Sequence, residues 1–210
     1  MKTGGPAIGR PSLVLEGRLT KPLRAYIGLG ANVGDAQANL ARAVRALSAL
    51  PGTSLGPVSP LYRTRPVGVT NQPDFLNAVV ALDVSAGPDA ETGALALLVA
   101  LKELERAIGR LERGRWGPRE IDLDLLLYGR HRVSVGRPDG RWLEVPHPHL
   151  HTRLFALAPL ADLAPGLRPP DWRETVAAAA ARCRLKEHAA AVLPLGEWDA
   201  AAGDWKAVST

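Results

Sequence analysis

Cysteine and aromatic side chains are scarce in this chain of 210 residues, which contains one cysteine, two phenylalanines and three tyrosines. The single cysteine, Cys183, cannot form an intramolecular disulfide or a cysteine-based zinc cluster, which excludes the disulfide-stapled secreted scaffolds. No apolar run approaches the ~20 residues that span a bilayer, and the first residues lack the apolar segment of a secretory signal. We therefore expect a protein of the reducing cytoplasm without a membrane partner, in which Cys183 is structural.

The rest of the composition is that of an ordinary globular protein, with 46% hydrophobic and 22% charged residues. The length fits one domain with a substantial core, and we expect that domain at residues 25–187 of a monomer. Residues 1–24 are expected to be a flexible extension, and residues 188–210 a C-terminal extension whose order the sequence does not define. The formal net charge of +5 would suit either nucleic acid or an anionic small substrate, and charge alone does not separate the two.

Hydrophobic periodicity predicts alternating strands and helices from Ala25 to Tyr128. Apolar residues recur at helical spacing after Asp35 and again from Pro88 to Gly109, whereas the other apolar stretches have extended patterns. The resulting order is strand, helix, strand, strand, helix, strand. This order is typical of the ferredoxin-like fold, an α/β (α+β) architecture in which helices cover an antiparallel sheet in three αβα layers. The expected strands are residues 25–29, 58–62, 75–84 and 121–128.

Further elements are expected around and after this core. Gly129 is expected to close a hairpin that returns through Val133 and Val135, and residues 150–163 and 175–191 have helical patterns. The segment RTRPVGVTNQPDF contains prolines and a glycine that forbid regular structure, and a loop of this length usually has a function. In GLGANVGD, the glycines are expected to let the chain turn from strand to helix, with Asn32 holding that turn.

Two aspartates in the strand segment IDLDLLLY are the clearest candidates for chemistry. The period of two places Asp122 and Asp124 on one face of the strand and the intervening Leu123 on the other. Adjacent carboxylates raise each other's pKa and destabilise a fold unless something neutralises them. Magnesium suits such a pair, because it takes a few carboxylate oxygens and completes its shell with water and phosphate. The alternative is that both aspartates are solvated or paired with nearby arginines.

The residues before this strand favour phosphate chemistry. Arg115, Trp116 and Arg119 lie in the constrained turn RWGPR, which places two guanidinium groups and one indole close to the aspartates. Guanidinium groups bind phosphate oxygens in bidentate geometry, and an indole can stack on a flat ring. Arg110 and Glu105 lie just upstream. The combination indicates phosphoryl-type transfer, in which positioning and charge neutralisation carry most of the catalysis.

From about Ala25 to about Leu167 the chain resembles the 6-hydroxymethyl-7,8-dihydropterin pyrophosphokinases of folate biosynthesis. The motifs that carry the resemblance are AYIGLGANVGD, LYRTRPVG with QPDFLNAVV, RWGPREIDLDLLLYG, and VPHPHLHTRLFALAPLADLAP. The RWGPR block together with IDLD is the most specific of them. The resemblance implies an enzyme that moves the pyrophosphoryl group of ATP to the hydroxymethyl oxygen of the pterin and releases AMP.

The resemblance also implies a role for individual residues. Asp122 and Asp124 would hold two magnesium ions, and together with Arg110 and Arg119 they would be the catalytic residues. Lys102 stands where the family can have a glutamine, and Arg113 is assigned within a loop that is short for the family. The residues that match pterin-binding positions are Thr64, Val67, Phe75, Asn77, Trp116 and Phe155. Those that match ATP-binding positions are Lys102, Glu105, Arg110, Arg113, Trp116, Arg119, His147 and Arg153.

Other interpretations of these motifs compete with this one. GLGANVG lacks the glycine spacing of a dinucleotide-binding fingerprint. His147, His149 and His151 alternate as zinc ligands on a strand would, but Pro146 and Pro148 disfavour a regular strand there. A kinase or nucleotidyltransferase could use the same acidic pair on another acceptor. A basic nucleic-acid module predicts a positive face without acids, so we expect small-molecule partners and no nucleic acid.

Overall fold

A computed structural model describes residues 22–66, 68, 70–111, 117–137, 140, 142–186 and 191–207. Residues 1–21, which make up nearly all of the expected N-terminal extension, lie outside these ranges. None of the helices within the described ranges is long and apolar enough to cross a membrane. The elements are β1 (Leu23–Ala31), α1 (Ala36–Ser48), β2 (Thr53–Val58), β3 (Leu61–Thr64), β4 (Phe75–Val84), α2 (Ala90–Ile108), β5 (Asp122–Tyr128), β6 (Val133–Gly136), β7 (Trp142–Val145), η1 (Leu150–Thr152), α3 (Leu154–Leu163), α4 (Val176–Arg184), β8 (Val192–Asp199) and β9 (Asp204–Ala207).

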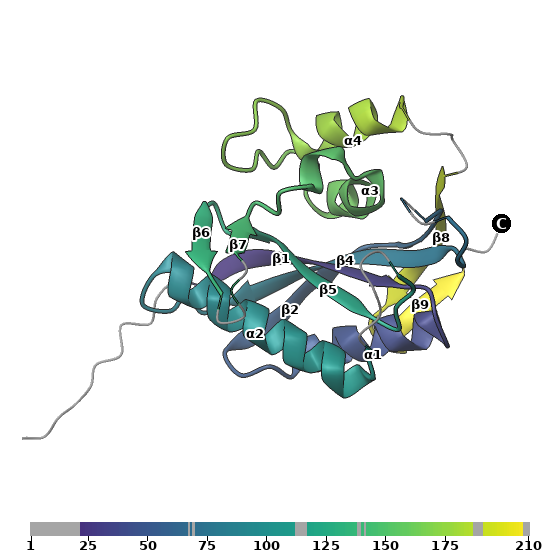
Figure 1. Cartoon of the computed structure of the whole chain (residues 1–210), viewed down its shortest axis with the longest axis horizontal. Coiled ribbons are helices and arrows are strands. Elements are labelled where there is room, and N and C mark those ends of the chain that lie inside the picture. Colours follow the sequence, from purple (N-terminus) through teal and green to yellow (C-terminus); the bar gives the residue numbers. More distant parts are fainter. Residues whose placement is uncertain are drawn as a thin grey trace, which may run out of the picture.

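Seven of these strands form one antiparallel sheet (Figure 1). Its strand order is β5-β1-β4-β3-β8-β9, with β2 also pairing with β4. The predicted order of strands and helices from β1 to β5 is confirmed, except that the second predicted strand is divided into β2 and β3. The division falls at Ser59 and Pro60, where Ser59 still exchanges hydrogen bonds with Val79 of β4.

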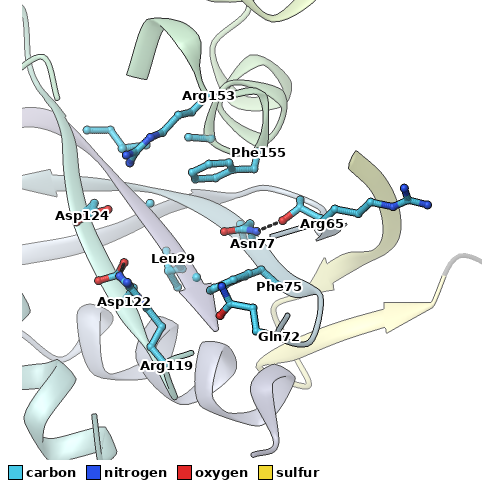
Figure 2. Close-up of a pocket in the computed structure, with 16 residues that line it drawn as sticks. Leu29, Arg65, Gln72, Phe75, Asn77, Arg119, Asp122, Asp124, Arg153 and Phe155 are labelled. Carbon is cyan, nitrogen blue, oxygen red and sulfur yellow. Dashed lines mark hydrogen bonds and ion pairs between the residues drawn. The ribbon is translucent and has the colours of Figure 1, made fainter. Parts of the chain in front are cut away.

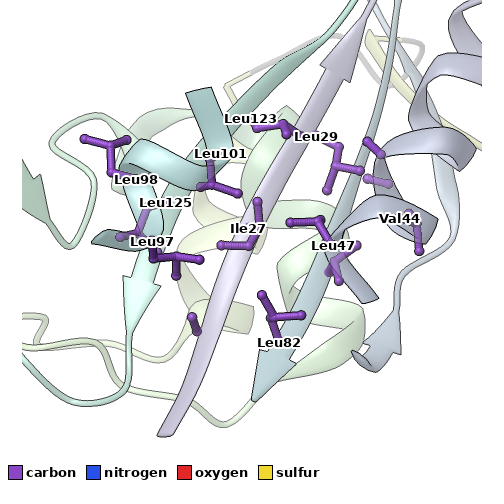
Figure 3. Close-up of a cluster of buried hydrophobic side chains, with 14 of the residues drawn as sticks. Ile27, Leu29, Val44, Leu47, Leu82, Leu97, Leu98, Leu101, Leu123 and Leu125 are labelled. Atoms are coloured by element: carbon purple, nitrogen blue, oxygen red, sulfur yellow. The ribbon is translucent and has the colours of Figure 1, made fainter. Parts of the chain in front are cut away.

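Helices cover both faces of this sheet, which confirms the three-layer αβα arrangement (Figure 1). On one face, Ile27 and Leu29 of β1 pack with the apolar sides of α1 and α2 (Figure 3). On the other face, Tyr26 of β1 and Val79 of β4 pack against α3 and α4. Neighbouring residues of one strand therefore belong to different cores, as the period of two requires.

The predicted hairpin from Gly129 toward Val133 and Val135 is wrong. Val133 and its neighbours form β6, which pairs with β7 in a separate two-stranded sheet. β5 pairs with β1. Directly after β5, the N–H of Gly129 donates to the carbonyl of Arg24 in β1 over 2.8 Å. The alternation of apolar residues correctly predicted the strand β6. Its partner, however, is β7, which lies further along the chain.

The predicted helices after β7 are shorter than expected. The segment 150–163 begins with the short 3-10 turn η1 and becomes regular only in α3. The segment 175–191 contains α4, which starts after Thr175, whose side chain accepts from the N–H of Ala178, and ends at Arg184. Alanine favours a helix, but propensity alone does not extend one beyond its packed face. In α4 that face consists of Val176, Ala179, Ala180 and Cys183.

The C-terminal extension, whose order the sequence left open, joins the main sheet. Within its described residues, β8 pairs with β3, and β9 pairs with β8. Trp205 of β9 is only 4% exposed, and its ring meets that of Trp198 edge to face with the centroids 4.7 Å apart. The two tryptophans thus belong to the core that α1 covers.

The close approach of β8 and β9 depends on Gly196. A Cβ atom at this position would overlap the backbone carbonyl of Lys206, so the two strands would have to separate. We expect Gly196→Ala to lower the free energy of unfolding by about 1–3 kcal/mol in a denaturant melt. Gly136→Ala is the matched control, because a Cβ there meets nothing within 4 Å. Equal losses for the two variants would contradict this packing.

Candidate active site

A cavity of about 160 Å³ opens on the face of the sheet that α3 covers (Figure 2). It lies where β1, β4 and β5 run side by side, below the start of α3. The structure therefore brings together residues that the sequence places far apart. The predicted site residues that line it are Thr64, Phe75, Asn77, Arg119, Asp122, Asp124, Arg153 and Phe155.

The floor of the cavity is made by glycines of β1. Gly30 pairs with Asn77 of β4 on one side and with Asp122 of β5 on the other. A Cβ atom at Gly30 would lie 3.0 Å from Oδ1 of Asn77, and one at Gly28 would lie 3.3 Å from the side chain of Leu126. The expectation that the glycines of GLGANVGD serve the turn holds for Gly34, which follows β1 with a φ of 67°, and is wrong for Gly28 and Gly30, because both lie inside β1 and neither has a positive φ. They keep the middle strand bare, so that groups on β4 and β5 face one space.

One end of the cavity presents an amide between aromatic rings. Nδ2 of Asn77 donates to Oγ1 of Thr64 over 2.6 Å, and both side chains are buried. Phe75 from β4 and Phe155 from α3 extend toward the cavity from different elements, with Asn77 between them (Figure 2). An amide beside flat apolar surfaces can bind a planar ring that carries both donors and acceptors on its edge.

At the other end, Asp122 is neutralised by two arginines. Its Oδ1 accepts from Arg110 and its Oδ2 from Arg119, each over 2.5 Å. Burial acts to raise the pKa of Asp122, but the nearby cations, Arg119 foremost, outweigh it and the pKa is lowered. The alternative of pairing with nearby arginines therefore describes Asp122 in this structure.

Asp124 is the open member of the acidic pair. Its side chain is 39% exposed, and Nζ of Lys102 lies 3.9 Å from its Oδ1. Among the residues that the structure describes, no three histidine, cysteine or acidic side chains converge as a metal cluster. Two carboxylates on one strand face are nevertheless a donor set that fits magnesium, which needs few protein oxygens when phosphates supply others.

Two residues of α2 hold the strand between the aspartates. Oε1 of Glu105 accepts from the N–H of Leu123 over 2.6 Å, and Nζ of Lys102 donates to the carbonyl of Leu123 over 2.8 Å. Lys102 also donates to Glu105. Burial raises the pKa of Glu105, and the attraction of Lys102 opposes that rise. Both residues were expected to contact ATP. In the structure they hydrogen-bond the backbone of Leu123, which orients the side chains of Asp122 and Asp124 toward the cavity.

Arg110 and Arg119 are each placed by a local backbone feature. Helix α2 ends at Gly109 in the left-handed conformation, with φ 106°, and the next residue is Arg110, which also contacts Glu105 at 2.6 Å. Arg119 lies in the segment before β5 and exchanges backbone and side-chain hydrogen bonds with Asn32. The two cations thus reach Asp122 from two different segments, the end of α2 and the turn before β5.

Asn32 is a site residue that sequence reasoning missed. It was expected to hold its own turn, but it links two distant loops. Its Oδ1 accepts from the N–H of Arg119 over 2.8 Å, and its Nδ2 donates to Gln72 and to the carbonyl of Pro73, each over 3.1 Å. Gln72 lines the cavity. The loop before β4 and the segment that carries Arg119 are therefore joined through one buried amide.

The remaining predicted residues divide into three groups. Arg153 lines the cavity with its guanidinium 5.7 Å from the centre of the Phe155 ring, and burial lowers its pKa. His147 lines a second cavity of about 220 Å³ that shares no lining residue with the first, and its backbone N–H donates to the carbonyl of Leu126; the pKa of its imidazole is lowered chiefly by burial. Val67, Arg113 and Trp116 lie outside the described residues.

This combination of fold and site defines a class of enzymes that act on phosphate groups. An antiparallel α/β scaffold carries paired carboxylates, converging guanidinium groups and an aromatic–amide recess in one continuous cavity. The chain belongs to the 7,8-dihydro-6-hydroxymethylpterin-pyrophosphokinase family, whose model matches residues 26–165.

Comparisons with individual proteins agree with this membership. The chain is 45% identical over 150 residues to a Pseudomonas aeruginosa protein named 2-amino-4-hydroxy-6-hydroxymethyldihydropteridine pyrophosphokinase, covering 71% of this chain and 86% of that protein. A Bacillus subtilis protein of the same name is 40% identical over 139 residues, covering 66% and 77%. A Plasmodium falciparum HPPK-DHPS crystal structure superposes with a TM-score of 0.66 at 14% identity, covering 91% of this chain. This chain spans 50% of the length of that one, and the likeness shows the fold.

The pairing of Asp122 makes a stability prediction. Because Asp122→Asn removes the negative charge and one of the two oxygens that accept from the arginines, we expect it to lower the free energy of unfolding by about 2 kcal/mol at neutral pH. Asp124→Asn, which removes a more exposed and weakly paired group, should cost less than about 1 kcal/mol.

The pH dependence of that difference has a definite sign. The folded-state pKa of Asp122 lies below its ordinary value, so its stabilising contribution is complete at neutral pH and is lost as the pH falls through the folded-state pKa. The gap between wild type and Asp122→Asn in chemical denaturation should therefore narrow in acid. A gap that widens in acid would show that the arginine pairs do not stabilise the fold.

Proposed function

We propose that this chain transfers the pyrophosphoryl group of ATP to the hydroxymethyl oxygen of 6-hydroxymethyl-7,8-dihydropterin, a step of folate biosynthesis that releases AMP. The family to which the chain belongs and the names of its relatives support this reaction. The structural observation that carries it is the position of Gly30, a bare residue between Asn77 and Asp122. A ring held at the amide would place its substituent next to the carboxylates.

We assign the pterin to the end of the cavity at Asn77. The amide and Thr64 would read the polar edge of the ring, and Phe75 and Phe155 would contact its faces. Because Asn77 and Thr64 already bind one another, their donor and acceptor atoms are oriented before the ring arrives. Val67 and Trp116 belong to this assignment through the family resemblance alone.

We assign the triphosphate to the end at Asp122 and Asp124. These aspartates would hold magnesium, with two ions as the proposed number, and the metal would neutralise phosphate charge during transfer. Arg110 and Arg119 lie beside the same carboxylates and can offer guanidinium donors to phosphate oxygens. The other residues proposed to contact ATP are Lys102, Glu105, Arg113, Trp116, His147 and Arg153.

The reaction requires little covalent chemistry from the protein. The hydroxymethyl oxygen forms a bond to the β-phosphorus, the bond from that phosphorus to the oxygen it shares with the α-phosphorus breaks, and AMP leaves. The hydroxyl proton is released. The contribution of the chain is to align the two substrates and to surround the reacting phosphate with fixed cations, which is where most of the acceleration of phosphoryl transfer arises. We further propose that the enzyme works as a cytoplasmic monomer.

Product analysis separates this proposal from its rival, a kinase or nucleotidyltransferase that uses the same aspartates. Incubation of the protein with ATP, magnesium and hydroxymethyl-dihydropterin should yield AMP and the pterin diphosphate in equal amounts, resolved by ion-pair chromatography. ADP would instead indicate an ordinary kinase, and free pyrophosphate a nucleotidyltransferase. Omission of the pterin is the control, because hydrolysis of ATP without an acceptor would also release AMP.

The open carboxylate gives a second prediction. Asp124→Ala should lower kcat by at least about 100-fold and weaken binding of manganese in the presence of an ATP analogue, because a metal ligand is lost. Its melting temperature should stay close to that of wild type, since the side chain is partly exposed. Asp83→Ala is the matched control: this aspartate of β4 pairs with Arg24 at the other end of the sheet. If Asp124→Ala bound manganese as tightly as the wild type, Asp124 would not be a metal ligand.

A further inference from the structure

The strand that carries Thr64 is short and has partners on both sides. β3 contains only four residues and pairs with β4 at three positions, which include Tyr62 opposite Asn77 and Thr64 opposite Phe75. On its other side, β8 pairs with all four residues of β3, and the N–H of Arg65 donates to the carbonyl of Ala191 over 3.1 Å. A strand this short at the edge of a sheet would be weakly held. The pairing with β8 turns it into an interior strand.

Hydrogen bonds from helix α1 hold the β8–β9 hairpin in place. Nε2 of Gln37 in α1 donates to the carbonyl of Trp205 and to Oδ1 of Asp204, each over 3.0 Å. The guanidinium of Arg45, also in α1, donates to the carbonyl of Gly203 over 2.7 Å. β9 therefore cannot shift along the sheet without breaking contacts to α1.

A buried relay runs from this hairpin to the pterin end of the cavity. Nε1 of Trp205 donates to the carbonyl of Ser59 over 2.8 Å, and both residues are buried. Ser59, which is fully buried, in turn accepts from the N–H of Val79 through its hydroxyl and donates its own N–H to the carbonyl of Val79. Val79 lies two residues from Asn77 on the same strand and the same face. Trp205 thus fixes the start of β3 against β4, and that register places Thr64 on Asn77.

We propose that the β8–β9 hairpin positions the pterin-reading pair, with Trp205 as the principal positioning residue. The hairpin lies beyond residues 26–165, the part of the chain that matches the family model. This inference rests on the proposed function, because it takes Thr64 and Asn77 as pterin contacts. It makes affinity for one substrate depend on a segment none of whose described residues lines the cavity.

The arrangement predicts an effect on the pterin and not on ATP. In the strand order β5-β1-β4-β3-β8-β9, the hairpin is next to the strand of Thr64 and lies at the opposite edge from β5, which carries Asp122 and Asp124. The groups that hold those aspartates come from α2 and from the segment of Arg119. The hydrogen bonds of Glu105, Lys102, Arg110 and Arg119 described above run to one another, to β5 or to Asn32.

The test is Trp205→Phe, which keeps an aromatic ring and removes the indole N–H. Binding is measured by equilibrium fluorescence titration with hydroxymethyl-dihydropterin in the presence of magnesium and a non-hydrolysable ATP analogue, and separately with the ATP analogue. We expect the Kd for the pterin to rise about tenfold, because a buried carbonyl loses its donor. The Kd for the ATP analogue should change by less than about twofold, and kcat at saturating pterin should stay near wild type.

Two further variants keep the result interpretable if Trp205→Phe folds poorly. Ser59→Ala breaks the relay at its hydroxyl and should show the same selective loss of pterin affinity. Val84→Ala shortens a buried side chain at the far end of β4, opposite Leu23 and Thr53, so it lowers stability at a position away from Ser59 and should leave both affinities unchanged. Equal loss of pterin affinity in Val84→Ala would mean that general destabilisation is the cause.

The outcomes distinguish this inference from the proposed function. If the wild-type protein does not bind the pterin, the proposed function is wrong and the positioning role falls with it. If the wild type binds the pterin and Trp205→Phe binds it equally well, or loses both ligands in proportion, only the positioning role is wrong. Selective loss of pterin affinity in Trp205→Phe and Ser59→Ala supports it.

Discussion

The absence of a side chain on the middle strand is the constraint on which the site depends. β1 runs between β4 and β5, and any residue larger than glycine at position 30 would fill the space between Asn77 and Asp122. Because Gly30 and Gly28 are bare, an amide on one neighbouring strand and carboxylates on the other face a shared cavity. The rigidity of three hydrogen-bonded strands then sets the separation of the two ends. A site made of loops would hold that separation less well.

The acidic end shows how the fold tolerates two carboxylates on one strand face. Asp122 is matched by guanidinium groups on both oxygens, whereas Asp124 stays open toward solvent. Glu105 and Lys102 bind the peptide groups of Leu123 between them, so the orientation of both aspartates is fixed by backbone contacts from α2. The charges and the position of the strand are linked, because Arg110 also contacts Glu105 and Lys102 lies close to Asp124.

Much of the fold and of the site could be predicted from the sequence because periodicity reports which face of a strand is buried. The order of elements from β1 to β5 and the shared face of Asp122 and Asp124 follow from it directly. Strand partners do not, since alternation at Val133 is equally compatible with any neighbour of like pattern, and the hairpin prediction failed there. The role of Gly30 was missed because a glycine in a strand and a glycine in a turn look alike without the register.

Long-range hydrogen bonds could not be predicted from the sequence either. Nothing near Asn32 in the sequence indicates that its amide would bind Gln72 and Arg119, and nothing near Trp205 points to Ser59. Both residues act on groups brought close only by the complete sheet. The family motifs contain most of the residues that line the cavity. The contacts that hold those residues in place come partly from outside the motifs, as at Trp205, and partly from motif residues such as Asn32, whose role was not expected.

The two C-terminal strands also determine which backbone the molecule presents to its neighbours in solution. Without them, the unpaired N–H and carbonyl groups of β3 would form an open edge available to any extended chain. With them, the edge is β9, a strand of only four residues with Asp204 and Lys206 on it, the latter bridged to Asp199. Short, charged edge strands resist the addition of further strands. The hairpin thereby protects the protein from edge-to-edge aggregation as well as completing its sheet.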